Sequence, residues 1–284
     1  MTPVISKIFE YFVLQSVSTK LESLLGPNQY AFRKYGSTES ALVRIHDALT
    51  CYLDDTNVMA VRMFCLDLTK AFDKLPHSVL LDRLNSQNVQ PGFILWLKSY
   101  LERRTQRVKV KGHLGPTAEV PSGVPQGSIL GPMLFAAVMG ALNVSLNDTL
   151  VMYADDITII EPVFVSSSCV FSENVNVVQE WITDCRMVIN YTKSKQILFK
   201  RKKDCVVTHP DIETCLTAKV LGVHWDSSLT WKTHFEQLLK VCAQRLYVFR
   251  ILKPVISVDL LCVVYNSIVV SILLYAALCS HLCH

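Results

Sequence analysis

Three aspartates stand where apolar segments end. Asp67 directly follows the apolar run 58–66, and Asp155 and Asp156 occupy the tip of an apolar hairpin expected over 150–160. Carboxylates at the rim of a core are costly unless a counter-charge accompanies them. Magnesium supplies that charge, because it binds carboxylate oxygens, keeps some water and bridges to phosphates. Two such ions stabilise the attacking and leaving oxygens of an in-line phosphoryl transfer, so these acids predict two-metal chemistry.

Each acid taken alone has an ordinary structural explanation. An Asp-Asp pair between strands is common in turns, and a single Asp after a strand is commonly a turn residue or a helix cap. The segment 123–132 changes the balance, because its glycines and prolines fix a tight path into a helix. Within it, Gln126 offers an amide to a sugar or base edge, and Gly127 lets a nucleotide approach the backbone closely. A binding loop is favoured over a purely structural loop.

The elements that must position these residues follow from the apolar spacing. Helices are expected over 5–25, 41–53 with Ser37 or Thr38 as cap, 77–84, 93–101, 132–142, 175–186 and from Leu229 onward. Strands are expected over 58–66, 107–111, 196–200 and 219–223, besides the hairpin over 150–160. Helices and mainly antiparallel strands mix without a regular βαβ alternation, which predicts an α+β fold.

The composition is that of a chain with a large core. Half of the 284 residues are hydrophobic and 18% are charged, which excludes a disordered chain. The net charge of +4 permits a phosphate-backbone partner without identifying one. Ten scattered cysteines without a CxxC pair predict free thiols in a reducing compartment, and hence an intracellular location in the cytoplasm or nucleus.

One segment, 260–279, is apolar enough to span a bilayer. Asn266, Ser267 and Ser271 within it, and the lack of an aromatic or basic belt beyond it, favour a buried helix instead, so no membrane partner is expected. A terminal cluster of Cys279, His281, Cys283 and His284 lacks a second ligand pair at zinc-site spacing, and a metal site there is not favoured.

In chain order, these motifs resemble the reverse transcriptases of non-LTR (LINE-like) retrotransposons. The matching segments are the fingers motif Gln29-Tyr30-Ala31-Phe32-Arg33 with Ser37-Thr38, motif A from Asp67 to Asp73, motif B from Gly123 to Phe135, motif C Tyr153-Ala154-Asp155-Asp156, motif D from Asn190 to Lys195, and a following motif with Leu221-Gly222-Val223, Asp226, Leu229, Trp231 and His234. Six motifs in order are strongly specific for the family.

The resemblance implies a catalytic centre. Asp67 and Asp155 would ligate two Mg²⁺ ions (Mn²⁺ being able to replace them), with Asp156 assisting and the Leu68 carbonyl completing a site. Lys193 is the implied proton donor to the pyrophosphate leaving group, and an ordinary exposed lysine is the alternative.

It also implies a nucleotide and primer site. The backbone of Thr69, Lys70, Ala71 and Phe72 would hold the incoming triphosphate. The Phe72 ring matches the family's steric gate, which excludes a ribose 2′-hydroxyl. The remaining implied contacts are Gln126 and Gly127 near the nucleotide sugar, Arg33 on the triphosphate, and Leu221, Gly222 and Val223 under the primer end.

The implied fold is the polymerase right hand. The fingers, N-terminally truncated, would comprise 1–60 and 75–122, the palm 61–74 and 123–232, and a partial helical thumb 233–284. The implied activity is RNA-directed DNA polymerisation with an RNA template, a DNA primer and dNTPs as partners. One departure is Gly140-Ala141, where the family often has an Asn-Asp pair.

Two alternatives stay open. One is a truncated, inactive retrotransposon fragment that at most binds nucleic acid. The other is a different two-metal enzyme on a palm-like fold, such as a nuclease or a nucleotide cyclase, against which Phe72 and the 123–131 loop argue.

Overall fold

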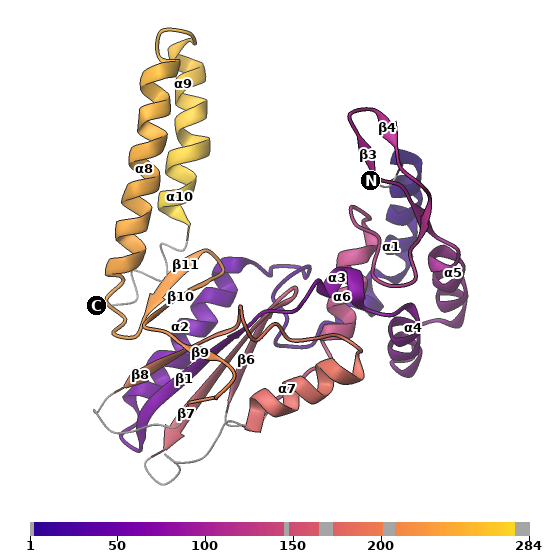
Figure 1. Ribbon diagram of the computed structural model, residues 1–284, viewed down its shortest axis with the longest axis horizontal. Helices are drawn as coiled ribbons and strands as arrows, with labels where there is room; N and C mark the ends of the chain where they lie inside the picture. Colours follow the sequence, from indigo (N-terminus) through magenta and orange to yellow (C-terminus); the bar gives the residue numbers. More distant parts are fainter. Residues whose placement is uncertain (1–2, 145–147, 165–172, 201–207, 276–284) are drawn as a thin grey trace. The chain divides into compact units, whose positions relative to one another are not determined.

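The computed structural model describes residues 3–144, 148–164, 173–200 and 208–275. Its helices and strands confirm the α+β class (Figure 1). The chain divides into two compact units. Unit 1 comprises Met1–Ser37, Cys65–Ile159 and Phe171–Ser194, and unit 2 comprises Thr38–Phe64, Ile160–Val170 and Lys195–His284.

Five helices of unit 1 begin within two residues of where the apolar spacing predicts. They are α1 Val4–Leu24, α4 His77–Ser86, α5 Pro91–Leu101, α6 Leu130–Met139 and α7 Glu173–Asp184. The short helix α3 Ala71–Lys74 was not expected from the sequence. Pro91 stands in the first turn of α5, where its missing N–H has no intrahelical partner to lose. Helix α6 is almost wholly buried, so it forms the centre around which α1 and α4 pack.

Two glycines let α1 and α6 approach closely. A Cβ on Gly140 would lie 2.1 Å from the Leu24 carbonyl oxygen, and one on Gly26 would lie 2.5 Å from the Gly140 carbonyl oxygen. Gly140 ends α6 as its C-cap. The departure from the family pattern at Gly140-Ala141 therefore has a packing explanation, because no side chain fits between these backbones.

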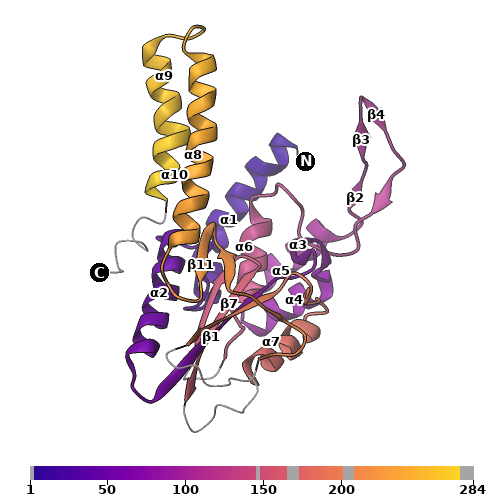
Figure 2. The same cartoon turned by 60° about the vertical axis from the view of Figure 1, so that its left-hand side comes forward.

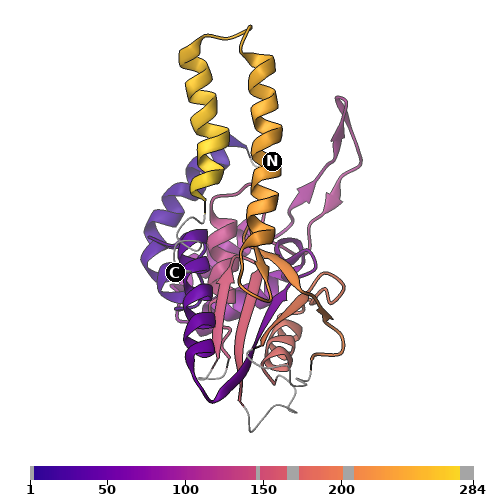
Figure 3. The ribbon, with the colours of Figure 1, turned by 90° about the vertical axis from the view of Figure 1, so that its left-hand side faces the viewer.

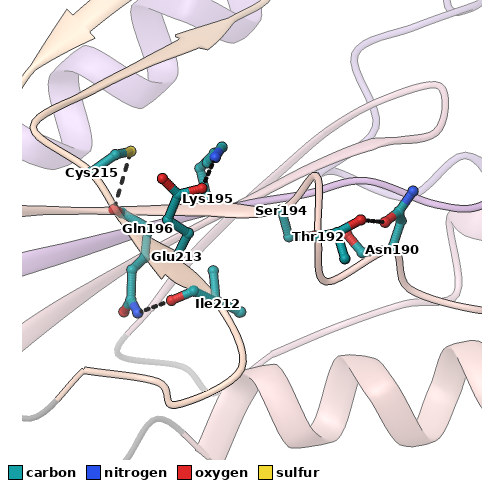
Figure 4. Close-up of polar contacts among 8 residues, drawn as sticks. All are labelled: Asn190, Thr192, Ser194, Lys195, Gln196, Ile212, Glu213 and Cys215. Atoms are coloured by element: carbon teal, nitrogen blue, oxygen red, sulfur yellow. Dashed lines mark hydrogen bonds and ion pairs between the residues drawn. The ribbon is translucent and has the colours of Figure 1, made fainter.

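The largest sheet has five strands in the order β6-β7-β1-β8-β9. Their bounds are β6 Thr149–Tyr153, β7 Asp156–Phe164, β1 Val58–Leu66, β8 Lys195–Lys200 and β9 Glu213–Thr214. Eight of the nine residues of β1 are buried, as its apolar run, interrupted only by Arg62, predicts. β8 and β9 pair in parallel, with Lys195 opposite Glu213 and bonded to it (Figure 4), so the sheet is mixed.

Unit 2 adds helix α2 Thr38–Asp54, the hairpin of β10 Thr217–Val220 and β11 Val223–Asp226, and the C-terminal helices α8 Lys232–Leu252, α9 Val258–Tyr265, η2 Asn266–Val270 and α10 Ser271–Leu274. Figure 3 shows α8 lying antiparallel to the helices that follow it. His46, Trp225 and Trp231 pack together, with ring centroids 4.9–6.5 Å apart. This cluster joins α2 to the β11–α8 connection.

Several elements differ in extent from the ranges expected from the sequence, and three of them have a clear physical reason. Of the strand expected over 107–111, only β3 Lys109–Val110 is formed. It ends there because Lys111 and Gly112 form a turn with positive φ. The strand expected over 219–223 is interrupted by a second such turn at Leu221 and Gly222. A two-residue turn between strands is normally recognised in a sequence by Asn or Asp at its first position. These two turns begin with Lys111 and Leu221, so the sequence pattern did not indicate them. The helix expected from Leu229 onward, α8, begins three residues later, at Lys232. The residues before it form a turn in which the Asp226 carboxylate accepts hydrogen bonds from the N–H groups of Ser228 and Thr230.

The apolar segment 260–279 is not a buried helix over its described part, to residue 275. Leu260 is 48% exposed and Leu274 64%, while Val269 is buried. An apolar run predicts burial but does not say which surface covers it. Among the described residues, no helix has the length and apolar content to cross a bilayer. The terminal Cys279, His281, Cys283 and His284 lie outside the described residues. None of the cysteines that the structure describes forms a disulfide bond.

Candidate active site

The segment after α7 fixes the backbone of Asp67. The Asp67 N–H donates to Ser194 Oγ at 3.1 Å, and its carbonyl accepts from the Asn190 N–H at 2.8 Å. The Ser194 hydroxyl, fully buried, in turn donates to the Asn190 carbonyl at 2.9 Å. Thr192 Oγ1 donates to Asn190 Oδ1 in the same turn (Figure 4). Both backbone polar groups of Asp67, its N–H and its carbonyl, are thus fixed by hydrogen bonds, and these bonds do not use its carboxylate.

Asp155 and Asp156 lie where β6 passes into β7. Ala154, just before them, has φ +59°, a left-handed conformation that is uncommon for a residue with a Cβ. Such a conformation persists where surrounding contacts enforce it.

The enforcing contacts come from Gln29, whose side chain is fully buried. Its Oε1 accepts from the N–H groups of Ala154 at 3.0 Å and Ala31 at 2.9 Å, and its Nε2 donates to the Ala154 carbonyl at 3.3 Å. Its backbone also forms a parallel bridge with Met152. The sequence motif drew attention to Gln29 without giving it a role, since nothing in a sequence shows which peptide a buried amide will bond.

The three carboxylates share one electrostatic environment. Burial raises the pKa of Asp155, and the charge of Asp67 adds to the rise. For the more exposed Asp156, partial burial, then Asp155 and then Asp67 raise the pKa in the same direction. Asp67 is therefore within electrostatic range of both Asp155 and Asp156.

An ion pair links the two strands whose ends carry Asp67 and Asp156. Arg62 Nη2 lies 3.2 Å from Glu161 Oε1, on the neighbouring strands β1 and β7. Arg62 is five residues before Asp67, and Glu161 is five residues after Asp156. Asp67 directly follows β1 and Asp156 begins β7, and the two strands are neighbours in the sheet.

Within the described residues, no group of three or more His, Cys, Asp or Glu side chains has the geometry of a complete metal site. The donor set nevertheless fits a hard cation. Magnesium in phosphoryl-transfer sites takes one or two carboxylates and completes its shell with water and substrate phosphates. Crowded carboxylates with raised pKa values are the groups that such a cation would relieve.

A cavity of about 310 Å³ lies in the same unit, lined by Phe72, Val124, Pro125, Gln126, Gly127 and Pro132. The Phe72 ring stacks on the buried Phe135 ring, with centroids 4.3 Å apart. Gln126 is exposed, and its Nε2 donates to Asp73 Oδ1 at 2.9 Å. The structure therefore brings together Phe72, Gln126 and Gly127, which the sequence predicted as neighbours of one nucleotide.

The loop that lines this cavity is fixed at both ends. At Gly123, with φ +84°, a Cβ would lie 2.6 Å from the carbonyl oxygens of Phe72 and Asp73, so only glycine fits. At the other end, the buried Glu10 carboxylate accepts from the Ile129 N–H at 2.7 Å and the Tyr100 hydroxyl at 2.6 Å. Burial, followed by the bond to Glu10, raises the Tyr100 pKa. Sequence inspection missed Glu10, whose surroundings give no local signal.

The remaining predicted nucleotide contacts have mixed surroundings. The Thr69 N–H donates to the Val188 carbonyl at 2.9 Å, so this amide is already engaged. Lys70 is exposed with φ +50° and precedes α3, to which Ala71 and Phe72 belong; Leu68 is buried. Arg33 Nη1 donates to the carbonyls of Gly26 and Gln29, both at 3.2 Å. Lys193 is exposed in the turn after Asn190.

The predicted primer contacts belong to unit 2. Leu221 and Gly222 form the turn between β10 and β11, and Val223 begins β11. The Tyr275 hydroxyl donates to the Leu221 carbonyl at 2.6 Å, and a Cβ on Gly222 would lie 2.9 Å from the Tyr275 ring. Tyr275 therefore supports this turn from outside the motif.

Comparison with known proteins identifies the family of the chain. The family profile described as "Reverse transcriptase (RNA-dependent DNA polymerase)" matches residues 1–225. The chain is 28% identical, over 87% of its length, to the probable RNA-directed DNA polymerase from transposon BS of Drosophila melanogaster, and 30% identical, over 82%, to that from transposon X-element of the same species. It spans 29% and 27% of these relatives.

Among solved structures, telomerase from Candida tropicalis in complex with a fragment of telomeric RNA superposes with a TM-score of 0.56. The match covers 78% of this chain and 36% of the telomerase chain, at 15% identity. Apo telomerase from the same species gives a TM-score of 0.51 over 78% of this chain. At this identity the likeness concerns the fold alone.

Proposed function

Because this chain belongs to the reverse transcriptase (RNA-dependent DNA polymerase) family, we propose that it extends a DNA primer on an RNA template. Its relatives are the polymerases of non-LTR retrotransposons. The observation that supports the proposal is that Asp67 and the Asp155–Asp156 turn, each held by backbone hydrogen bonds, belong to the same unit as the Phe72–Gln126 cavity.

The proposed reaction is attack of the primer 3′-hydroxyl on the α-phosphate of a dNTP, with release of pyrophosphate. Asp67 and Asp155 would hold divalent cations with help from Asp156 and the Leu68 carbonyl. Two Mg²⁺ ions, for which Mn²⁺ substitutes, would supply charge neutralisation at the attacking and leaving oxygens. The backbone bonds to Ser194 and Gln29 would keep the carboxylates in place before substrate arrives.

The nucleotide would lie between the acids and the cavity. The Phe72 ring, held by its stack on Phe135, would exclude a 2′-hydroxyl, and Gln126 and Gly127 would face the sugar. Arg33 and the backbone of Lys70, Ala71 and Phe72 would approach the triphosphate, with the Thr69 amide already committed to Val188. Lys193 would protonate the leaving pyrophosphate, and Leu221, Gly222 and Val223 would support the primer end.

We assign the right-hand subdomains as the motifs imply: 1–60 and 75–122 to the fingers, 61–74 and 123–232 to the palm, and 233–284 to part of the thumb. The antiparallel pair formed by α8 with the helices that follow it suits a helical thumb, which grips duplex in polymerases.

Primer extension on an RNA template with Mg²⁺ tests the proposal. Asp155→Ala should abolish incorporation, because one cation site loses its carboxylate. Asp184→Ala, which removes an exposed aspartate from α7, is the matched control and should extend primers like the wild type.

Incorporation that survives Asp155→Ala would overturn the site. A wild-type chain that binds template and primer but incorporates no nucleotide would overturn the activity and favour a binding-only protein. Pyrophosphate release without a template would favour another two-metal enzyme.

A further inference from the structure

A basic arm, residues 103–119, extends from the end of α5. It consists of two short antiparallel ladders, with β2 Thr105–Gln106 on β5 Ala118–Glu119, and β3 Lys109–Val110 on β4 His113–Leu114. Nearly every residue from 105 to 119 is exposed. Figure 2 shows the arm projecting from the other elements of unit 1. A two-stranded ribbon that buries so little apolar surface gains little stability of its own, so its persistence calls for another explanation.

The charge of the arm is one-sided. It carries Arg103, Arg104, Arg107, Lys109 and Lys111, and its one acidic residue, Glu119, is at its base. Among the described residues, no ion pair involves Lys109 or Lys111. Arg107 Nε donates to Thr117 Oγ1 across the arm at 2.6 Å, so it braces the two strands. Within the part of the chain that the structure describes, the charges of Lys109 and Lys111 are therefore not neutralised by an ion pair.

The tip breaks a local rule. Lys111 and Gly112, with φ +48° and +88°, form the two-residue turn between β3 and β4. Such turns favour Asn or Asp at the first position, because the left-handed conformation is unfavourable for other residues with a Cβ. Sequences depart from local preference mainly at functional positions. A lysine at this point gives up turn stability and places a positive charge at the end of the arm.

The residues that directly follow the arm, Ser122 and Gly123, are hydrogen-bonded to the candidate active site. Ser122 Oγ donates to the Asp73 carbonyl at 2.9 Å, and the Gly123 N–H donates to the Leu75 carbonyl at 2.8 Å. Ser122 also pairs with Pro76 in an antiparallel bridge. Asp73 follows Phe72 and bonds Gln126, so the arm and the cavity share one backbone junction within unit 1.

We propose that the basic arm binds the phosphate backbone of the template–primer duplex, with Lys109 and Lys111 as contacts. The inference rests on the proposed function, since it needs a duplex held at the cavity. Two exposed ammonium groups, for which the described residues supply no acidic partner, suit phosphates, which attract them irrespective of base sequence. Because the arm joins the chain next to the cavity, a nucleic acid on the arm would be the duplex that leads away from the primer 3′ end, rather than an unpaired strand.

The test is fluorescence anisotropy with an RNA–DNA hybrid as probe, measured from low to moderate salt. Each lost phosphate contact should make the plot of log K against log salt less steep by about 0.7–0.9. The double variant Lys109→Ala with Lys111→Ala should lose about twice that. Lys98→Ala, which removes an exposed lysine from α5, is the matched control and should keep the wild-type slope.

Lys111→Asn separates binding from folding. Asparagine suits the turn better than lysine, so the thermal stability should hold or rise while the salt slope falls by one contact. A wild-type slope in Lys111→Asn and in the double variant overturns the proposal, as does failure of the wild type to bind hybrid. A single-stranded RNA probe whose binding is equally sensitive to the arm would overturn the duplex assignment.

Primer extension on the same variants keeps the two proposals apart. If the wild type polymerises and the arm variants bind with unchanged slopes, the arm alone is refuted. If the arm variants reduce the salt slope of hybrid binding but neither the wild type nor any variant incorporates nucleotide, the proposal for the arm is supported and the proposed polymerase activity is refuted.

Discussion

The Gln29 carboxamide bonds both polar groups of the Ala154 residue: Oε1 accepts its N–H at 3.0 Å and Nε2 donates to its carbonyl at 3.3 Å. These bonds cross 125 positions of sequence and hold the left-handed residue directly before Asp155. The acids of the turn are thus oriented by a side chain from a distant segment.

Gln29→Ala should lower the rate of primer extension by about 10–100-fold, the usual effect of losing a group that orients a ligand side chain. The Mg²⁺ concentration for half-maximal rate should rise, because the carboxylates are no longer fixed before binding. Gln29→Glu is the informative partner: it keeps the acceptor but not the donor, so an intermediate effect is expected. Equal Mg²⁺ dependence in all three proteins would show that Gln29 serves stability alone.

The raised pKa values of Asp155 and Asp156 predict a dependence of stability on pH. A folded carboxyl with a raised pKa keeps its proton to higher pH than the unfolded one, so stability falls as pH rises from about 4 through the folded pKa. Asp156→Asn, which cannot ionise, should raise the melting temperature at pH 8 in metal-free buffer by about 1–3 °C. The gain should shrink toward pH 4 and on adding Mg²⁺.

Scanning calorimetry at both pH values measures this effect, with Asp184→Asn as a control that should show none. A lower melting temperature for Asp156→Asn at pH 8 without metal would contradict the prediction, since it would mean that the ionised carboxylate stabilises the fold.

The stack of Phe72 on Phe135 predicts a change of sugar selectivity on mutation. Phe72→Val should increase ribonucleotide incorporation relative to deoxynucleotide incorporation, about 10-fold or more, because a smaller side chain leaves room for the 2′-hydroxyl. Phe135→Leu loosens the same stack but leaves the Phe72 ring in the cavity, so it should change selectivity less. Competition between rNTP and dNTP in primer extension measures the ratio, and an unchanged ratio in Phe72→Val would remove the gate assignment.

The contact of α1 with α6 predicts opposite effects of two glycine substitutions. Gly140→Ala places a Cβ 2.1 Å from the Leu24 carbonyl oxygen, so the free energy of unfolding should fall by about 1–3 kcal/mol or more. Gly92→Ala, in the first turn of α5, meets no atom within 4 Å and should raise it by up to about 1 kcal/mol. Urea denaturation of both variants tests this pair, and equal effects would mean that α1 and α6 do not pack as described.

Much of this protein was determined by local sequence. The nine-residue strand β1 and the helices α4, α5 and α7, each with ends within two residues of those expected, follow from apolar spacing, which acts over a few residues. The motif residues Asp67, Phe72, Gln126 and Asp155 were identifiable for the same reason, since their types and spacing were present in the chain. The family followed from those motifs.

Tertiary structure alone decided what holds them. Glu10 on Ile129, Gln29 on Ala154 and Ser194 on Asp67 each join segments more than a hundred positions apart. A buried polar group must find a partner, but the sequence does not say which one, because that depends on how distant backbones meet. The same reason explains Gly140, where the sequence showed a missing side chain and only the packing of α1 showed why none can be there.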